Sequence, residues 1–343
     1  MKNESEKIIE VLITFTLPDE LVQQLGAVSK RLHISVIPVR NPSEISDEIW
    51  YKTEVLITEK IIPSPENAPN LRWIQFNYAG IDFALEEPIV QKKEILLSTL
   101  SGAAAPQVAE FVLMAMLALC HKMPALVHNQ RFHEWPPDRF ARLVPRELRG
   151  STIGLIGYGS IAREIARITQ PLGVKILALK RNVMKPEDQG YLQEGIGDPK
   201  GDLFTRLYPV QAICSMVKEC DFIVNTLPKT SDTHHVIAEE EFASMKPTAY
   251  LVDVSRGGII KLSALKAALQ EKKIAGAFID VFEQEPLLKD NPIWDTPNIV
   301  ISPHIAGISM HYNERAVELI QENLRRYIED SSLVNLFNWI EGY

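Results

Sequence analysis

The sequence predicts an α/β protein made of two doubly wound domains, each a parallel sheet with helices on both faces. Its 343 residues are more than one hydrophobic core usually serves, so two domains are expected. Short runs rich in β-branched residues alternate with helical patterns almost throughout, as in parallel sheets joined by crossover helices. A glycine-rich turn at residues 154–162 opens a second series of such units.

Composition narrows the class of partner. The chain is 46% apolar and 23% charged, which is ordinary for a globular protein. Its formal net charge of −8 disfavours nucleic acid as the main partner, because Lys and Arg drive phosphate binding. A small anionic substrate remains compatible with this charge, since one Arg can dominate a pocket. The cysteines form no C-x-x-C pair, and we interpret them as reduced core thiols: Cys120, Cys214 and Cys220.

No targeting or membrane segment is expected. The first residues are charged and show no apolar region followed by a small-residue cleavage site. The longest apolar run, residues 111–120, is too short to cross a bilayer. We therefore expect a cytoplasmic protein with no membrane partner and no metal site.

The first hundred residues form the first series of elements. An amphipathic stretch from Asp19 to about Leu32 predicts a helix, and the isolated Gly26 and Gly80 make no phosphate-binding turn. The expected strands are residues 11–15, 34–39, 55–58, 71–76 and 95–99.

The second series follows a strongly apolar stretch, residues 106–123, which predicts a helix packed on all sides. The polar, proline-containing residues 133–150 come next, and we interpret them as the crossing between domains. The strands expected after it are residues 153–156, 175–179, 221–226, 249–254, 275–280 and 299–302. The expected helices are residues 161–170, 211–220, 239–245 and 263–270.

The last predicted helix, residues 313–330, is expected to return to the first domain. We therefore place one domain at residues 1–104, completed by 303–343, and the other at 105–302. Residues 183–209, called the insertion below, are longer than a usual connection and carry no recognisable motif.

The glycine-rich turn predicts a dinucleotide site. Gly157 permits a tight turn, and Gly159 lets the backbone approach a pyrophosphate. Ala162 is small enough to replace a third glycine, and the helix that starts at Ser160 and Ile161 offers its N–H groups to phosphate. A purely structural glycine turn is the alternative.

The end of the next strand bears on cofactor choice. Enzymes that prefer NAD place there an acid that binds the ribose diol. This sequence has Lys180 in that place, followed by Arg181. Two cations suit a 2′-phosphate, so we expect NADP to be preferred, with NAD still possible. The alternative is a solvated basic strand end in an NAD enzyme.

Five motifs, in order, identify a family. They are residues 154–162, Leu227-Pro228, and residues 252–259, 280–286 and 302–307. Together they resemble the signature set of the D-isomer-specific 2-hydroxyacid dehydrogenases, over about residues 105–302. The resemblance implies a Rossmann coenzyme domain, a flavodoxin-like substrate domain with the cofactor in the cleft, and a homodimer. It also implies hydride transfer between NAD(P)H and a small 2-keto acid to give a D-2-hydroxy acid, as in phosphoglycerate, glyoxylate and hydroxypyruvate reductase-like enzymes.

This chemistry needs three groups. A 2-keto acid presents its carboxylate and carbonyl oxygen in one plane, which the guanidinium of Arg256 can bind in bidentate fashion. His304 is the candidate proton donor to the carbonyl oxygen, and Glu285 would fix the tautomer of its imidazole. The family uses an Arg–Glu–His trio, and all three positions match.

Further site residues follow from the resemblance. The backbone of Ala79 and Gly80 would hold the substrate carboxylate, unless that turn is only structural. Asp280 resembles an aspartate near the nicotinamide, with a structural strand-end acid as the alternative. The remaining expected cofactor contacts are Val108, Leu227, Pro228, Val254 and Ser255.

One rival function comes from another class. Corepressors that sense NAD(H) are built on the same fold, and some keep the catalytic trio, so fold alone does not decide. The sequence shows no interaction tail or basic arm of the kind such a protein would use. Formate dehydrogenase is disfavoured, because its relatives carry Gln where this chain has Glu285.

Overall fold

The computed structural model describes residues 7–188 and 190–343. The chain forms two compact units: the first is the chain up to Ala104 with Ser309–Tyr343, and the second is Ala105–Ile308. The interpretation of residues 133–150 as the crossing is wrong, because they lie wholly within the second unit. The end of this segment leads into the sheet of the second unit, whose first strand starts at Thr152. Just before that strand, Leu148 is buried and Gly150 N donates to Gly173 O.

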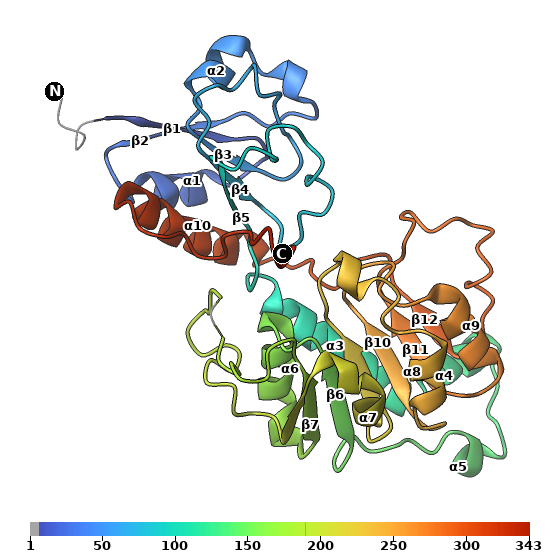
Figure 1. Ribbon diagram of the computed structural model, residues 1–343. Coiled ribbons are helices and arrows are strands. Elements are labelled where there is room, and N and C mark those ends of the chain that lie inside the picture. The colour runs from blue at the N-terminus through green and yellow to red at the C-terminus, as the bar shows by residue number, and fades with distance from the viewer. Residues whose placement is uncertain (1–6, 189) are drawn as a thin grey trace. The chain divides into compact units, whose positions relative to one another are not determined.

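The first unit is a parallel sheet of five strands within the described residues, in the order β2-β1-β3-β4-β5. Its longest helix, α10 (Tyr312–Ile328), comes from the C-terminal end of the chain and lies beside α1 (Asp19–Gly26), as Figure 1 shows. The buried core includes Leu12, Leu56 and Phe76. The other elements are β1 (Ile9–Ile13), β2 (Leu32–Val36), α2 (Asp47–Lys52), β3 (Val55–Thr58), β4 (Trp73–Phe76) and β5 (Leu96–Ser98).

The second unit is a parallel sheet of seven strands within the described residues, in the order β12-β11-β10-β9-β6-β7-β8. Its strands are β6 (Thr152–Ile156), β7 (Lys175–Leu179), β8 (Arg206–Tyr208), β9 (Phe222–Asn225), β10 (Tyr250–Asp253), β11 (Gly276–Ile279) and β12 (Ile299–Ile301). Its helices are α3 (Ala105–Cys120), α4 (Met123–Arg131), α5 (Arg139–Arg142), α6 (Ser160–Thr169), α7 (Ile213–Val217), α8 (Glu239–Ser244) and α9 (Leu262–Gln270). Two parallel-sheet α/β units confirm the predicted fold class.

Several elements differ from the prediction. The first helix ends at Gly26 rather than near Leu32, because Leu32 already begins β2 and pairs with Ile9. The predicted helix 211–220 is a short 3-10 turn followed by α7, which ends at Val217. The insertion contains an unexpected edge strand, β8, whose three residues pair in parallel with the end of β7.

Among the described residues, no single helix is long and apolar enough to cross a membrane. The pair α3 and α4 passes that test of length and composition together, with a bend of 65° between the two helices.

Candidate active site

The glycine-rich turn joins β6 to α6, and the two glycines that follow β6 differ in what the protein requires of them. Gly157 has φ +90°, and a Cβ there would lie 3.0 Å from Leu227 Cδ2 and 3.3 Å from Leu227 N. The fold itself therefore demands glycine at this position. Gly159 has φ −93°, which any residue adopts, and no described heavy atom lies within 4 Å of a Cβ built there. The open space at Gly159 fits the close approach of a bound pyrophosphate.

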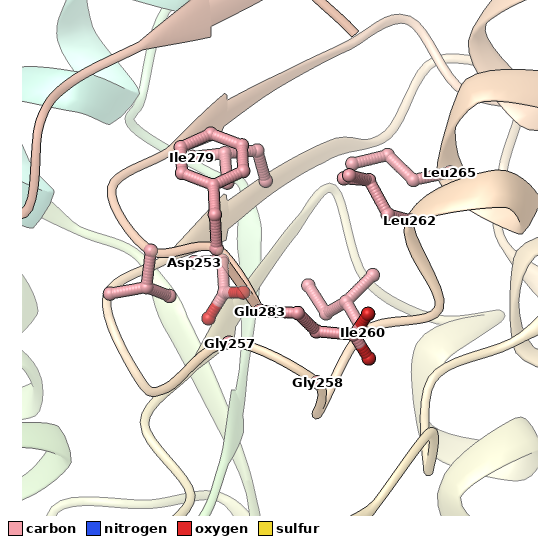
Figure 2. A pocket seen from close by; sticks show the side chains of 10 residues that line it. Asp253, Gly257, Gly258, Ile260, Leu262, Leu265, Ile279 and Glu283 are labelled. Atoms are coloured by element: carbon pink, nitrogen blue, oxygen red, sulfur yellow. The ribbon is translucent and has the colours of Figure 1, made fainter. Parts of the chain in front are cut away.

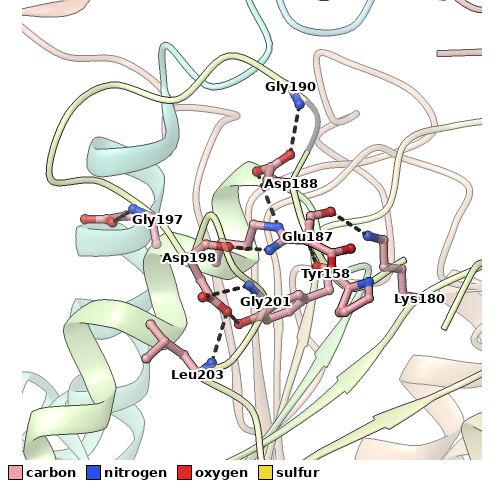
Figure 3. A network of polar contacts seen from close by, with 12 residues as sticks. Tyr158, Lys180, Glu187, Asp188, Gly190, Gly197, Asp198, Gly201 and Leu203 are labelled. Carbon is pink, nitrogen blue, oxygen red and sulfur yellow. Dashed lines mark hydrogen bonds and ion pairs between the residues drawn. The ribbon is translucent and has the colours of Figure 1, made fainter. Parts of the chain in front are cut away.

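The end of β7 is shaped by the insertion. Lys180 Nζ donates to the backbone oxygens of Lys185 and Glu187, both in the insertion. Figure 3 shows Lys180 beside Glu187. Burial lowers the pKa of Lys180. Arg181 is more exposed, and its Nη2 lies 3.8 Å from Asp232 Oδ2. Both cations lie at this strand end as expected, but the Lys180 ammonium is already hydrogen-bonded to the insertion.

A buried arginine on α6 anchors the insertion. Arg163 is only 1% exposed, and its guanidinium donates to the backbone oxygens of Pro186 and Asp198. Its Nε lies 3.3 Å from Asp188 Oδ2. Tyr158, in the glycine-rich turn, donates its hydroxyl to Asp198 Oδ2 at 2.7 Å (Figure 3). The insertion is thus tied directly to the predicted phosphate-binding turn. No sequence motif predicted these roles of Arg163, Tyr158 and Asp198.

Asp198 organises the insertion locally. Its two carboxylate oxygens accept backbone hydrogen bonds from Gly201, Asp202 and Leu203, at 3.0 to 3.1 Å, in addition to the Tyr158 bond. Burial raises the pKa of Asp198, but these hydrogen bonds outweigh it and hold that pKa below its ordinary value. The Asp198 carboxylate therefore holds residues 198–203 in a turn.

The strand end before Arg256 is organised by a buried carboxyl group. Asp253 Oδ1 accepts hydrogen bonds from Asn225 Nδ2 (3.1 Å), Ser255 N (3.2 Å) and Ser255 Oγ. Burial raises the pKa of Asp253 to about 7. Val254 N donates to Asn225 O, so β9 also fixes this segment. Arg256 Nη1 donates to Ser255 O at 2.8 Å.

The loop that follows Arg256 touches the loop that carries Glu285. A Cβ at Gly257 would lie 1.9 Å from Phe282 O and 2.4 Å from Glu283 N, so only glycine allows this approach. Phe282 N in turn donates to Glu285 Oε1 at 2.9 Å. Figure 2 shows Gly257, Gly258 and Glu283 together around a small pocket beneath these loops, with Asp253 in its wall.

His304 follows β12 and is held in the left-handed region, with φ 53°. Its Nδ1 lies 2.7 Å from Glu285 Oε2, which is the contact expected from the sequence. With Nδ1 bonded to a carboxylate, Nε2 is the imidazole nitrogen available to a substrate. Both side chains are partly exposed, at 44% for His304 and 36% for Glu285.

The carboxylate of Asp280 holds the turn around His304. It accepts hydrogen bonds from Ser302 Oγ (2.6 Å), Ile305 N (3.0 Å) and Ala306 N (2.9 Å). His304 N also donates to Asp280 O. These bonds account for an unusual backbone conformation at His304. They fit the structural alternative for Asp280, and its cofactor contact stays a prediction.

Most predicted site residues of the second unit follow the carboxyl ends of its parallel strands. Arg256 follows β10, Glu285 follows β11 and His304 follows β12, three neighbouring strands. Gly157 follows β6, and Leu227 and Pro228 follow β9. Ligands of doubly wound sheets bind at this edge. Val108 lies elsewhere, buried on α3.

Ala79 and Gly80 belong to the first unit, just after β4. The turn is fixed at its start by Asn77, whose N donates to Thr58 O at 2.7 Å and whose O accepts from the Tyr312 hydroxyl at 2.8 Å. The backbone of this turn is therefore held by both β3 and α10.

Comparison with known proteins agrees with this arrangement. Residues 113–306 match the model of the D-isomer specific 2-hydroxyacid dehydrogenase NAD binding domain. A glyoxylate reductase from Thermococcus litoralis is 31% identical over 289 residues, 82% of each chain. An (S)-sulfolactate dehydrogenase from Chromohalobacter salexigens is 30% identical over 258 residues, 75% of this chain and 78% of that protein.

Solved structures agree as well. A D-isomer specific 2-hydroxyacid dehydrogenase family protein from Aeromonas salmonicida has a TM-score of 0.77 at 27% identity, covering 96% of this chain and 99% of that one. An NADPH-dependent glyoxylate/hydroxypyruvate reductase from Sinorhizobium meliloti, solved with NADP and sulfate, shares the fold, with a TM-score of 0.75 at 22% identity, covering 98% of this chain and 100% of that one. The chain belongs to the D-isomer specific 2-hydroxyacid dehydrogenase family.

Proposed function

We propose that this protein reduces a small 2-keto acid with NAD(P)H to give a D-2-hydroxy acid. The observation that carries the proposal is the His304–Glu285 hydrogen bond on the strand edge that also carries Arg256. The sensing alternative is not favoured, because relatives at about 30% identity are named as reductases and dehydrogenases.

Each residue of the trio has one task in this mechanism. The Arg256 guanidinium binds the carboxylate and the carbonyl oxygen of the keto acid, and so polarises the carbonyl. The nicotinamide supplies a hydride, with its two electrons, to the carbonyl carbon. His304 gives the proton from Nε2 to the carbonyl oxygen, and solvent then reprotonates the imidazole. Glu285 accepts the Nδ1 proton in a hydrogen bond and keeps Nε2 directed at the substrate.

Backbone groups support binding in this proposal. The N–H groups of Ala79 and Gly80 hold the substrate carboxylate. The turn of Gly157 and Gly159, with the start of α6, holds the pyrophosphate. The other proposed cofactor contacts are Ser160, Ile161, Leu227, Pro228, Val254, Ser255, Val108 and Asp280.

We also propose that NADP is preferred over NAD. The end of β7 offers Lys180 and Arg181 where an NAD enzyme would place a carboxylate. Because Lys180 already binds two carbonyl oxygens of the insertion, Arg181 is the stronger candidate for the 2′-phosphate. Each cation facing this phosphate is worth about 1 kcal/mol or more, so NADPH should exceed NADH about tenfold or more in kcat/KM.

The test of cofactor choice is Lys180→Asp combined with Arg181→Ala. This variant should lose or reverse the preference for NADPH while turnover with NADH stays largely intact. A clear preference for NADH in the wild type would show that other residues recognise the ribose.

We further propose that the protein works in the cytoplasm as a homodimer. Exposed apolar side chains concentrate between residues 114 and 144, where Trp135 is 82% and Phe140 80% exposed. A contiguous patch of such side chains would mark an interaction surface. Sedimentation should give a dimer for the wild type, and Phe140→Glu should weaken it. A wild-type monomer at assay concentration would contradict the proposal.

A substrate panel tests the central proposal. Glyoxylate, hydroxypyruvate, pyruvate and larger 2-keto acids are each mixed with NADH or NADPH and the protein, and loss of absorbance at 340 nm is followed. We expect turnover with at least one acid, and chiral analysis of a product with a stereocentre should give the D form. Tight NAD(H) binding with no turnover of any acid would favour the sensing function instead.

A further inference from the structure

Two adjacent histidines and a glutamate form a second cluster in the second unit. The rings of His234 and His235 are stacked, with centroids 3.8 Å apart and planes at 26°. His235 Nε2 lies 2.9 Å from Glu283 Oε1. One potential ligand atom from each of the three residues lies within 4.8 Å of the other two. Within residues 7–188 and 190–343, no other trio of His, Cys, Asp or Glu was found to meet this condition.

The backbone conformation explains why the side chains of His234 and His235 lie on the same side of the chain. Consecutive residues of an extended segment direct their side chains to opposite sides. His234 is extended, with φ −62° and ψ 121°, but His235 is left-handed, with φ 52°. His235 N donates to Gly258 O at 2.8 Å, which fixes this conformation against the neighbouring loop. A left-handed residue other than glycine or asparagine is uncommon and marks a position that the surroundings hold firmly.

The third member approaches from a different loop. Glu283 lies four residues after β11, and Figure 2 shows its side chain beside the loop of Gly258. A Cβ at Gly258 would lie 3.2 Å from Glu283 Oε1 and 3.5 Å from His234 Nδ1. Gly258 therefore leaves the space in which the carboxylate and the imidazole can come together.

We propose that His234, His235 and Glu283 bind a divalent transition metal ion of the zinc type. Two imidazole nitrogens and one carboxylate oxygen are a ligand set that Zn²⁺ takes readily. Ligand atoms around a tetrahedral zinc are about 3.3 Å apart, whereas these three lie within 4.8 Å of one another. Side-chain rotations that move the ligand atoms by about 1 Å would therefore complete the site. His234 and Glu283 are exposed, so their side chains can move into solvent-accessible space, and water can supply the fourth ligand.

Such an ion would link two loops that also carry catalytic candidates. Gly258, which binds the His235 backbone, lies two residues after Arg256, and Glu283 lies two residues before Glu285. The ion would join the His234-His235 segment directly to the Glu283 loop. The binding site is distinct from the His304–Glu285 pair, and the metal-binding proposal does not depend on the proposed reaction.

The experiment is a titration of the full chain with ZnCl₂, followed by calorimetry and by the melting temperature. We expect one ion per chain and a melting temperature raised by about 2–4 °C or more at saturation. His234→Asn, His235→Asn and Glu283→Gln should each weaken zinc binding at least about tenfold. Loss of a residue that only hydrogen-bonds to a ligand already lowers metal affinity by about that factor. Asparagine is chosen at position 235 because it tolerates the left-handed backbone.

Two control variants separate this site from other histidines. His311→Asn removes an exposed His–Glu pair, 2.8 Å from Nδ1 to Glu314 Oε2, and should leave zinc affinity unchanged. His304→Gln removes the His304–Glu285 pair and should also leave it unchanged. Absence of binding at about 100 µM zinc, a free energy weaker than about −5.5 kcal/mol, would overturn the proposal. Loss of binding in His304→Gln but not in the trio variants would also overturn it.

Discussion

Replacing Gly257 by alanine would drive apart the two loops that carry Arg256 and Glu285. The added Cβ would lie 1.9 Å from Phe282 O, 2.0 Å from Phe282 C and 2.4 Å from Glu283 N. All three are backbone atoms, so no side-chain rotation can relieve the clash. The two backbones must separate by roughly 1 Å or more to reach ordinary contact distances.

The displacement should reach the catalytic candidates directly. Arg256 is the neighbour of the substituted residue, and Phe282 N donates to Glu285 Oε1. Glu285 in turn holds His304 through its second oxygen. A misplacement of 1 Å in such an arrangement lowers kcat/KM by about a hundredfold. Overpacking of this kind should cost about 1–3 kcal/mol of stability.

The assay combines keto-acid-dependent oxidation of NAD(P)H with a thermal melt and a cofactor titration. We expect Gly257→Ala to lose about a hundredfold in kcat/KM, to melt at lower temperature and to keep most of its cofactor affinity. Gly26→Ala is the matched control, because no described heavy atom lies within 4 Å of a Cβ there. That change should be neutral or slightly stabilising at the end of α1. Turnover and melting temperature of Gly257→Ala within about twofold and 1 °C of wild type would refute the reasoning.

Three other substitutions test separate parts of the site. Arg256→Lys keeps the charge but loses the planar fork, so the drop in kcat/KM should correspond to about 2–4 kcal/mol of lost transition-state stabilisation. A KM unchanged for every keto acid would count against carboxylate binding. Gly159→Ala should leave the melting temperature unchanged and weaken NAD(P)H binding about tenfold or more in a fluorescence titration, because its Cβ meets only the space assigned to the pyrophosphate; unchanged affinity would exclude that assignment. Asp253→Asn can keep the three hydrogen bonds to Oδ1 and removes a buried ionisable group. Since folding raises the pKa of Asp253 from 3.8 to about 7, the native state binds the extra proton between those pH values, and the wild type loses stability as pH rises through that window. The variant should therefore gain on the wild type by up to about 4 kcal/mol between pH 4 and pH 8 in urea denaturation, and an equal difference at both pH values would contradict this.

The parallel-sheet architecture could be predicted because its signals are local. Buried strands such as β6 and β9 are short apolar runs, and the glycines at 157 and 159 mark a strand-to-helix turn by their spacing. The His304–Glu285 contact was expected from motif order, although nothing local to either residue shows that the two side chains meet.

The contacts that hold the insertion could not be predicted, because they join polar residues far apart in sequence. Arg163 would be assigned to a solvent-facing position of α6, yet it is buried because the insertion folds over it and offers two carbonyl oxygens. The edge strand β8 has only three residues, too few for a period of two to be recognised. Stacking of His234 on His235 depends on a left-handed backbone at His235, which only a minority of histidines adopt.

The most direct test of the proposed reaction is the single-turnover rate of His304→Gln. Enzyme loaded with NAD(P)H is mixed with the best keto acid of the panel, and the loss of nicotinamide absorbance is followed. Glutamine preserves a polar side chain of similar reach but cannot give up a proton near neutral pH. We predict that the rate falls about a hundredfold or more, while the dissociation constant of NAD(P)H changes less than about twofold. A variant that transfers hydride at nearly the wild-type rate would contradict the assignment of His304 as the proton donor.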